Sequence, residues 1–92
     1  MNTPAALIAY TDAQDIFDAA AKAHRIASYC YLKRRNRKTA AHLNAASEAF
    51  DAALAGVNAA RDAYDLAVYQ DECHRARAAQ MADASRQADL FA

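Results

Sequence analysis

Large apolar residues recur at every seventh position in the middle of the chain. The series consists of Leu43, Phe50, Val57 and Tyr64, and an alanine follows each of them three positions later. In the heptad notation abcdefg, this is a large residue at position a and alanine at position d. The pattern predicts a long helix with a single apolar stripe. We call the a and d positions together the seam.

A second series of the same kind precedes the first. Its a positions are Tyr10, Phe17, His24 and Tyr31, and alanine follows the first three of them at position d. Because both series have the same length and phase, an antiparallel helical hairpin that turns near Arg37 is the simplest arrangement. The expected facing pairs are Tyr31 with Leu43, His24 with Phe50, Phe17 with Val57, and Tyr10 with Tyr64. Alanine at d lets the two helices approach closely.

The two seams predict an all-α, coiled-coil-like hairpin that forms one helical domain over residues 1–92. A single Gly, a single Pro and the lack of β-branched runs also favour helix throughout. The expected parts are a first helix at about 4–35, a basic turn at 33–39 and a long second helix at about 40–88.

Short polar residues mark the expected helix ends. Thr3 fits an N-cap immediately before Pro4 at the first helical position. Asn36 tolerates the left-handed backbone conformation that often ends a helix, so it is expected to end the first one. Thr39 is expected to be the N-cap of the second helix.

Two positions leave the helix boundaries open. Gly56 costs about 1 kcal/mol relative to alanine inside a helix. It either breaks the second helix, which gives a three-helix bundle, or makes room for Phe17 within a continuous helix. Thr11 with Gln14 has the form of a capping box that would interrupt the first helix. The seam keeps its phase across both positions, which favours two continuous helices.

The seam changes after Val68, because Asp71 occupies the next a position. Residues beyond about 72 are therefore expected to project past the first helix and to contact something other than the hairpin. A different stripe begins here, and with two nearby arginines it forms a candidate partner-binding surface: Leu66, Tyr69, Cys73, Arg75 and Arg77. At the end of the chain, Leu90 and Phe91 are expected either to dock or to fray.

The composition predicts a thin core. Alanine accounts for 28 of the 92 residues, whereas Leu, Ile, Val and Phe together number 14. A hairpin of this composition buries little apolar surface to offset the entropy cost of ordering its chain. We therefore expect it to be completed by a protein partner or by self-association as a homodimer.

Charge is strongly segregated along the chain, although the formal net charge is +0. Residues 22–38 carry a net charge of +7, whereas residues 39–72 carry −5. Five cations lie within six positions at the expected turn, and we call this cluster the tip: Lys33, Arg34, Arg35, Arg37 and Lys38.

The tip is the strongest candidate binding site in the sequence. Its cations suit phosphate contacts, and Tyr29 and Tyr31 are near enough to stack on bases. A nucleic-acid-binding protein usually spreads positive charge along a face, whereas the helices beyond the tip are acidic. Docking on a protein partner is therefore the first prediction, and nucleic-acid binding is the alternative. A row of carboxylates on the second helix is either a solvated face or an imitation of a phosphate backbone: Glu48, Asp51, Asp62, Asp65 and Glu72.

The sequence holds no motif for catalysis. It lacks a Gly-rich phosphate loop and a Gly-x-Ser-x-Gly motif, and a two-helix hairpin offers no cleft, so we expect no enzymatic activity and no cofactor. Four potential ligands would meet around a metal only in the three-helix alternative, and we expect no metal site: Cys30, His42, Cys73 and His74. Two cysteines without a disulfide framework are typical of a cytoplasmic protein, and no apolar run is long enough to span a membrane.

In size, helicity and absence of catalytic motifs, the chain is similar to small accessory proteins of phages and mobile elements, including inhibitors of host defence such as anti-CRISPR proteins. The likeness lies in composition and carries over no functional residue. It implies an inhibitory function. We therefore expect a non-catalytic helical module that docks on a larger protein, with a nucleic-acid-binding protein and a structural homo-oligomeric coiled coil as the alternatives.

Overall fold

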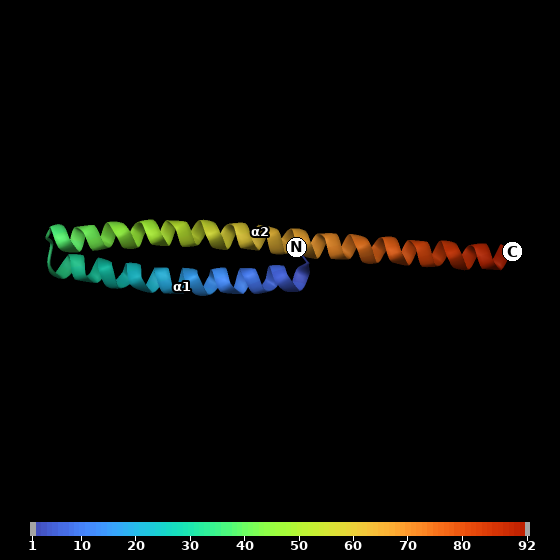
Figure 1. Ribbon diagram of the computed structural model, residues 1–92, viewed down its shortest axis with the longest axis horizontal. Helices are drawn as coiled ribbons and strands as arrows, with labels where there is room; N and C mark the ends of the chain where they lie inside the picture. Colours follow the sequence, from blue (N-terminus) through green and yellow to red (C-terminus); the bar gives the residue numbers. More distant parts are fainter. Residues whose placement is uncertain (1, 92) are drawn as a thin grey trace.

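The protein is an antiparallel hairpin of two helices. A computed structural model describes the backbone of residues 2–91 and the side chains of residues 2–90. Helix α1 runs from Thr3 to Lys33 over 31 residues, and helix α2 runs from Arg37 to Phe91 over 55 residues. They lie side by side in a rod of 84 × 15 × 13 Å, and α2 continues well past the start of α1 (Figure 1). The predicted all-α hairpin with a long second helix is thus confirmed.

The seam holds the two helices together. From Thr3 to Tyr31 and from Leu43 to Asp71, every a and d residue is at least partly buried, whereas every b, c and f residue is exposed. The ring centroids of Tyr10 and Tyr64 lie 6.0 Å apart, and those of His24 and Phe50 lie 5.5 Å apart. These two predicted pairs are therefore confirmed.

The core is as thin as the composition predicts. The buried hydrophobic residues within the described chain are three alanines at d positions, Ala6, Ala53 and Ala67. The larger a residues are half-buried, and five of them form aromatic contacts across the seam. Phe17, which was expected opposite Val57, has its ring 5.2 Å from that of Phe50. Phe50 therefore contacts two aromatic rings of α1 at once.

The pairing extends one step beyond the predicted apolar seam. The hydroxyl of Thr3 donates a hydrogen bond to the Asp71 carboxylate, and both residues occupy a positions. The register that pairs Tyr10 with Tyr64 places these two residues opposite each other one heptad further on. A polar pair thus closes the seam at its open end, so Asp71 both ends the apolar stripe and contributes to the pairing of the helices.

The first helix is capped one residue earlier than predicted. The Asn2 side-chain oxygen accepts a hydrogen bond from the Ala5 backbone N–H at 2.9 Å, and Thr3 is already helical. The prediction of Thr3 as the N-cap is therefore wrong, because the side-chain oxygen of Asn2 accepts from one of the free N–H groups at the start of the helix. The suggested interruption at Thr11 is also wrong, because its hydroxyl donates to the Leu7 carbonyl at 2.9 Å within a continuous helix.

The turn spans only Arg34 to Asn36, and Asn36 caps α2. The Thr39 N–H donates to the Asn36 side-chain oxygen at 2.9 Å, and the Asn36 N–H donates to the Thr39 hydroxyl at 3.1 Å. This reciprocal pair is a capping box. No residue of the described chain has positive φ, so the predictions of a left-handed Asn36 and of Thr39 as the cap are both wrong. The Thr39 hydroxyl also donates to the Arg34 carbonyl at 2.6 Å, which ties the turn to α2.

Helix α2 passes through Gly56 without a break, so the three-helix alternative is wrong. Gly56 is exposed, and a Cβ built on it would have no atom within 4 Å. The idea that this glycine makes room for Phe17 is therefore also wrong. Seam packing on either side is sufficient to carry the helix across an unfavourable residue.

Replacing Gly56 with alanine is expected to raise the free energy of unfolding by about 1 kcal/mol, because alanine restricts the unfolded chain and nothing obstructs its methyl group. Urea unfolding followed by circular dichroism at a fixed protein concentration measures this change. The converse variant, Ala55→Gly at the neighbouring exposed position, should lower the free energy by a similar amount. Destabilisation by Gly56→Ala would show that the glycine backbone is needed.

Beyond Asp71, α2 has no partner helix within the described residues. We call residues 72–91 the overhang, which at about 1.5 Å per residue extends roughly 30 Å past the start of α1. All of its described side chains are exposed. Leu90 is 81% exposed and does not dock, while the expected docking or fraying of the Phe91 side chain lies outside the described residues.

Candidate docking surfaces

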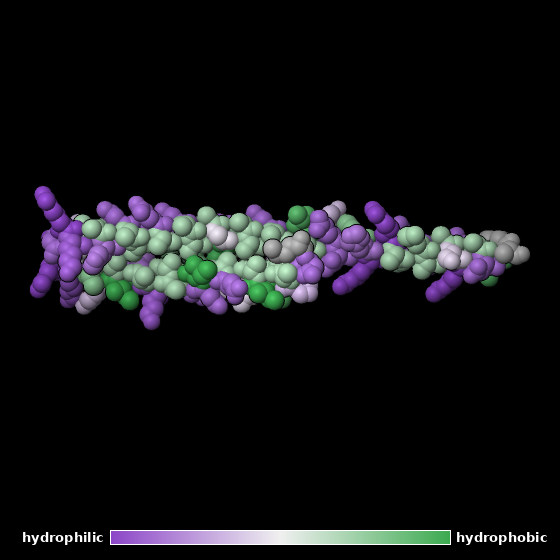
Figure 2. Space-filling model, in the orientation of Figure 1, coloured by the Kyte–Doolittle hydropathy of each residue, from purple (hydrophilic) through white to green (hydrophobic). Residues whose placement is uncertain are grey.

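The tip is a preformed cluster of exposed cations. All five of its basic residues are exposed, and the capping box with the bond to the Arg34 carbonyl fixes the backbone between them. Figure 2 shows hydrophilic side chains crowded at this end of the rod. No acidic residue occurs between Asp18 and Glu48, so the sequence on both sides of the turn offers no carboxylate to neutralise the cluster.

The two tyrosines near the tip already interact with its cations. The Lys33 Nζ lies 5.4 Å from the centroid of the Tyr29 ring, and the Arg35 guanidinium carbon lies 5.9 Å from that of Tyr31. These are cation–π distances. Tyr31 is also half-buried in the seam. Both rings therefore help to position the cations of the tip. Stacking on bases, the role expected from the sequence, would require the rings to leave these contacts.

The position of the tip on the helices has an electrostatic cost. Lys33 lies in the last turn of α1, where a cation stabilises the helix dipole. Arg37 and Lys38 lie in the first turn of α2, which contains no acidic residue. Cations at a helix N-terminus oppose the dipole, by roughly 0.3–1 kcal/mol each at exposed positions. Arg37 and Lys38 therefore lower the stability of α2, so helix stability does not explain why cations occupy these two positions.

The predicted stripe at the base of the overhang is exposed. Leu66 is 56% and Tyr69 64% exposed, and Cys73 is exposed as well. The Cys73 side chain, one turn further along, raises the pKa of Tyr69 above its usual value, because the hydrogen bond between them favours the protonated hydroxyl as donor. Arg75 and Arg77 are also exposed.

The tip and this stripe are two separate surfaces in one molecule. Thirty-six residues of continuous helix separate Arg37 from Cys73, which is about 54 Å. The acidic row lies between them, with all five carboxylates exposed along α2. The predicted partner-binding residues therefore do not form a single site within one hairpin.

The potential metal ligands are also far apart. Cys30 and His42 lie near the tip, whereas Cys73 and His74 lie at the base of the overhang, because α2 does not fold back at Gly56. Within the residues that the structure describes, no three His, Cys, Asp or Glu side chains are grouped so as to hold a metal ion. Neither helix, over its described length, has a segment both long and apolar enough to cross a membrane.

A further surface was missed by the sequence analysis. On one side of the hairpin, the c and g positions of both helices form a second stripe. It extends from Ala5 to Cys30 on α1 and from His42 to Leu66 on α2. Asp12 is the one charged residue at these positions. The opposite side, at b and e, carries several charges: Asp18, Arg25, Asp51, Arg61 and Asp65. We call the c and g stripe the alanine face. In the sequence, the alanine face is recognisable as a second seven-residue repeat, made of small residues.

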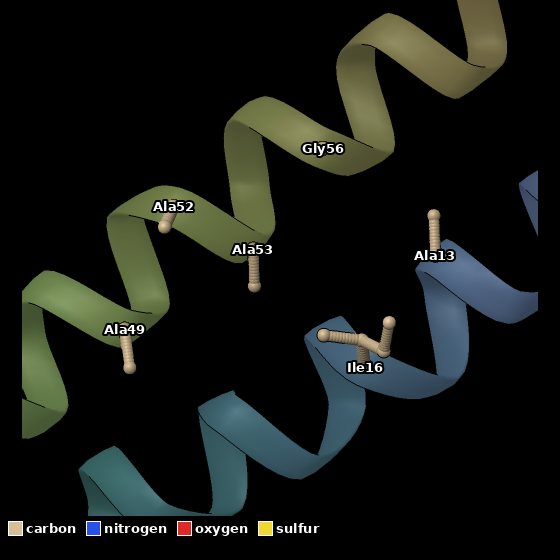
Figure 3. A pocket seen from close by; sticks show the side chains of 6 residues that line it. All are labelled: Ala13, Ile16, Ala49, Ala52, Ala53 and Gly56. Carbon is tan, nitrogen blue, oxygen red and sulfur yellow. The ribbon is translucent and has the colours of Figure 1, made fainter.

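The alanine face contains a shallow groove between the helices. The groove has a volume of about 420 Å³, and it is lined by Ala13, Ile16, Ala49, Ala52, Ala53 and Gly56. Ala13 points from α1 toward α2, while Ala49 and Ala53 point from α2 toward α1 (Figure 3). Ile16 stands beside the groove with 63% of its surface exposed. The groove is therefore apolar, open to solvent and bordered by one large aliphatic side chain.

Comparisons with known proteins add no family. No protein-family model, curated protein or solved structure matches this chain. The tip, the stripe at the base of the overhang and the alanine face are thus the features from which a function is inferred.

Proposed function

We propose that the protein is a non-catalytic binding module that docks through its tip on an acidic surface of a larger protein. The observation that supports this is the fixed cluster of five exposed cations within a stretch that lacks carboxylates from residue 19 to residue 47. Because the turn is capped and bonded before a partner arrives, little conformational entropy is lost on docking. A rod 84 Å long also blocks access to the surface around its contact, which suits an inhibitory function.

The electrostatic cost of the tip supports the same proposal. Arg37 and Lys38 oppose the dipole of α2, while Lys33 and Arg35 are positioned over tyrosine rings. A partner that supplies carboxylates would relieve the repulsion between these cations and satisfy the helix terminus. The tip therefore gains more from an acidic partner than from solvent.

An acidic protein surface fits better than a nucleic acid. A phosphate backbone that ran along the rod would meet the open half of the hairpin, residues 3–18 and 57–72, which carries seven carboxylates and one cation. Contact would therefore be restricted to the tip. A protein that presents a local cluster of carboxylates has no such limitation.

Reversing the charge of Arg34, Arg35 and Arg37 to Glu is expected to abolish partner capture. Affinity purification from the cells in which the protein is made, quantified by mass spectrometry, compares this variant with the wild type. The matched control is Arg75, Arg77 and Arg86 changed to Glu, which makes the same charge change on the overhang. Loss of the captured protein in the control but not in the tip variant would contradict the proposal and assign docking to the overhang.

A gel-shift titration with short duplex DNA distinguishes the alternative. We expect no retention of the wild type at 150 mM salt. Retention that the tip variant loses and that weakens steeply with salt would instead identify a nucleic-acid-binding protein.

A further inference from the structure

We propose that the alanine face is covered by a second copy of this chain, packed antiparallel to the first in a four-helix bundle. This goes beyond the proposed function and does not depend on what the tip binds. It rests on the exposed area of the hairpin, on the pattern of residues along the alanine face and on the segregation of charge between the two ends of the hairpin.

The hairpin exposes far more surface than a compact protein of its mass. Its accessible surface is 7239 Å² at 10.0 kDa, whereas a compact monomer of that mass exposes about 5,200 Å². The excess is therefore about 2,000 Å². The alanine face runs from Ala5 to Cys30 along α1, about 39 Å, and the hairpin is 15 Å wide. Pairing two copies therefore removes roughly 1,200 Å² in total, the lower limit for a stable interface.

The alanine face is complementary to itself when two copies are antiparallel. Six successive c and g positions of α2 are small, from Ala45 to Ala63 with Gly56 among them. An antiparallel copy places Ala52 opposite the partner's Gly56 and Ala49 opposite the partner's Ala59. Small residues on both sides let the two copies of α2 approach closely. The groove beside Ile16 is filled in the same step.

The large residues of the face fit the same arrangement. On α1 the aliphatic side chains at c and g are Ile16 and Ile26, which are 63% and 55% exposed. In the antiparallel register, Ile16 of each copy lies about 3 Å along the rod from Ile26 of the other, close enough for contact, so one two-fold axis pairs both. Burying four exposed isoleucines supplies apolar contact that the single hairpin lacks.

Charge fixes the direction of the second copy. The half of the hairpin next to the turn, residues 19–56, has seven cations and two carboxylates, a net +5. The open half has a net −6. Parallel stacking would place two clusters of five cations side by side, whereas antiparallel stacking places each positive half on a negative half.

The antiparallel dimer also unites the two separate docking surfaces. The tip of one copy then lies level with the base of the partner's overhang. The residues that are about 54 Å apart in one hairpin, Arg37 and Cys73, meet between copies at each end of the bundle. A composite site with cations from one copy and Tyr69 from the other results.

Light scattering behind a sizing column tests the association. At 100 μM we expect the wild type to have twice the mass of the 10.0 kDa chain. Ile16→Asp should raise the dissociation constant about 100-fold, because each dimer would bury two unpaired carboxylates. Leu32→Asp is the matched control, since Leu32 is 66% exposed at a b position away from the face. A monomeric wild type, or an Ile16→Asp variant that remains a dimer, would overturn the proposal.

A cross-linking experiment tests the direction independently, even if Ile16→Asp fails to fold. In a background with Cys30→Ser and Cys73→Ser, A49C protein is mixed with A59C protein of different isotopic mass and oxidised mildly. We expect the mixed disulfide to exceed either homodisulfide at least tenfold, because the two positions face each other only in the antiparallel dimer. N58C protein, with the cysteine on the opposite side, should not cross-link. An A49C–A59C yield no higher than with N58C would refute this register.

Discussion

Replacing Phe50 with alanine is expected to lower the free energy of unfolding by about 3 kcal/mol or more. Phe50 is the second of the four large a residues on α2, and its ring contacts both Phe17 and His24 of α1. No other residue of the described seam joins two aromatic rings in this way. Because the buried core consists of three alanines within the described residues, little else compensates for the lost contact.

Thermal and urea unfolding followed by circular dichroism measure this loss, with the protein concentration held fixed because self-association adds to apparent stability. The control is Leu32→Ala, which removes an exposed aliphatic side chain of similar size and should change the free energy by less than about 0.5 kcal/mol. Equal melting curves for the Phe50 variant and the wild type would mean that the ring does not hold the helices together.

Replacing Ala67 with leucine is expected to destabilise the hairpin by about 1–3 kcal/mol. Leucine at d normally strengthens a coiled coil. Here Ala67 is 3% exposed and lies between the Tyr10–Tyr64 pair and the Thr3–Asp71 hydrogen bond, so the helices must separate to admit a larger side chain. The same change at Ala55, an exposed f position, is the control and should be nearly neutral.

Urea unfolding shows whether leucine at position 67 stabilises the hairpin, as in an ordinary coiled coil, or destabilises it by overpacking. A higher midpoint for Ala67→Leu than for Ala55→Leu would contradict the close packing at this level of the hairpin. A lower midpoint with an unchanged slope would show that lost stability, and not a change in unfolded-state compactness, is responsible.

Much of the fold was predictable because one rule governs it. Two seams with the same seven-residue phase, joined by a short turn, favour one antiparallel register, and the Tyr10–Tyr64 and His24–Phe50 contacts follow from it. Continuity through Gly56 was also predictable, because one unfavourable residue costs less than the loss of the phased seam on either side.

The helix ends were less predictable because several short polar residues compete to cap them. Asn2 and Thr3 are adjacent, and Asn36 and Thr39 are three apart, so sequence alone did not decide which side chain accepts from which N–H. The reciprocal bond between Asn36 and Thr39 depends on the tight turn between the helices. A sequence pattern does not contain that geometry.

The candidate sites were predictable only in part. The tip was evident because its five cations lie within six consecutive positions, and the structure adds the cation–π contacts that orient two of them. The alanine face was missed because its residues are small and recur at seven-residue intervals, whereas apolar stripes are usually recognised by their large side chains. The predicted antiparallel register already places the c and g stripes of α1 and α2 on the same side, whereas the groove and the exposure of Ile16 required the structure.

The Thr3–Asp71 hydrogen bond marks the boundary between the paired and the unpaired part of α2, although the helix itself is continuous. Up to Asp71, every turn of α2 packs on α1, so its backbone opens only when the hairpin as a whole opens. Past Asp71, twenty residues remain as a solitary helix, too short to be strongly favoured in water and able to unwind turn by turn from its end. Helix α2 is therefore one structural element with two modes of melting, a cooperative one near the turn and a gradual one along the overhang.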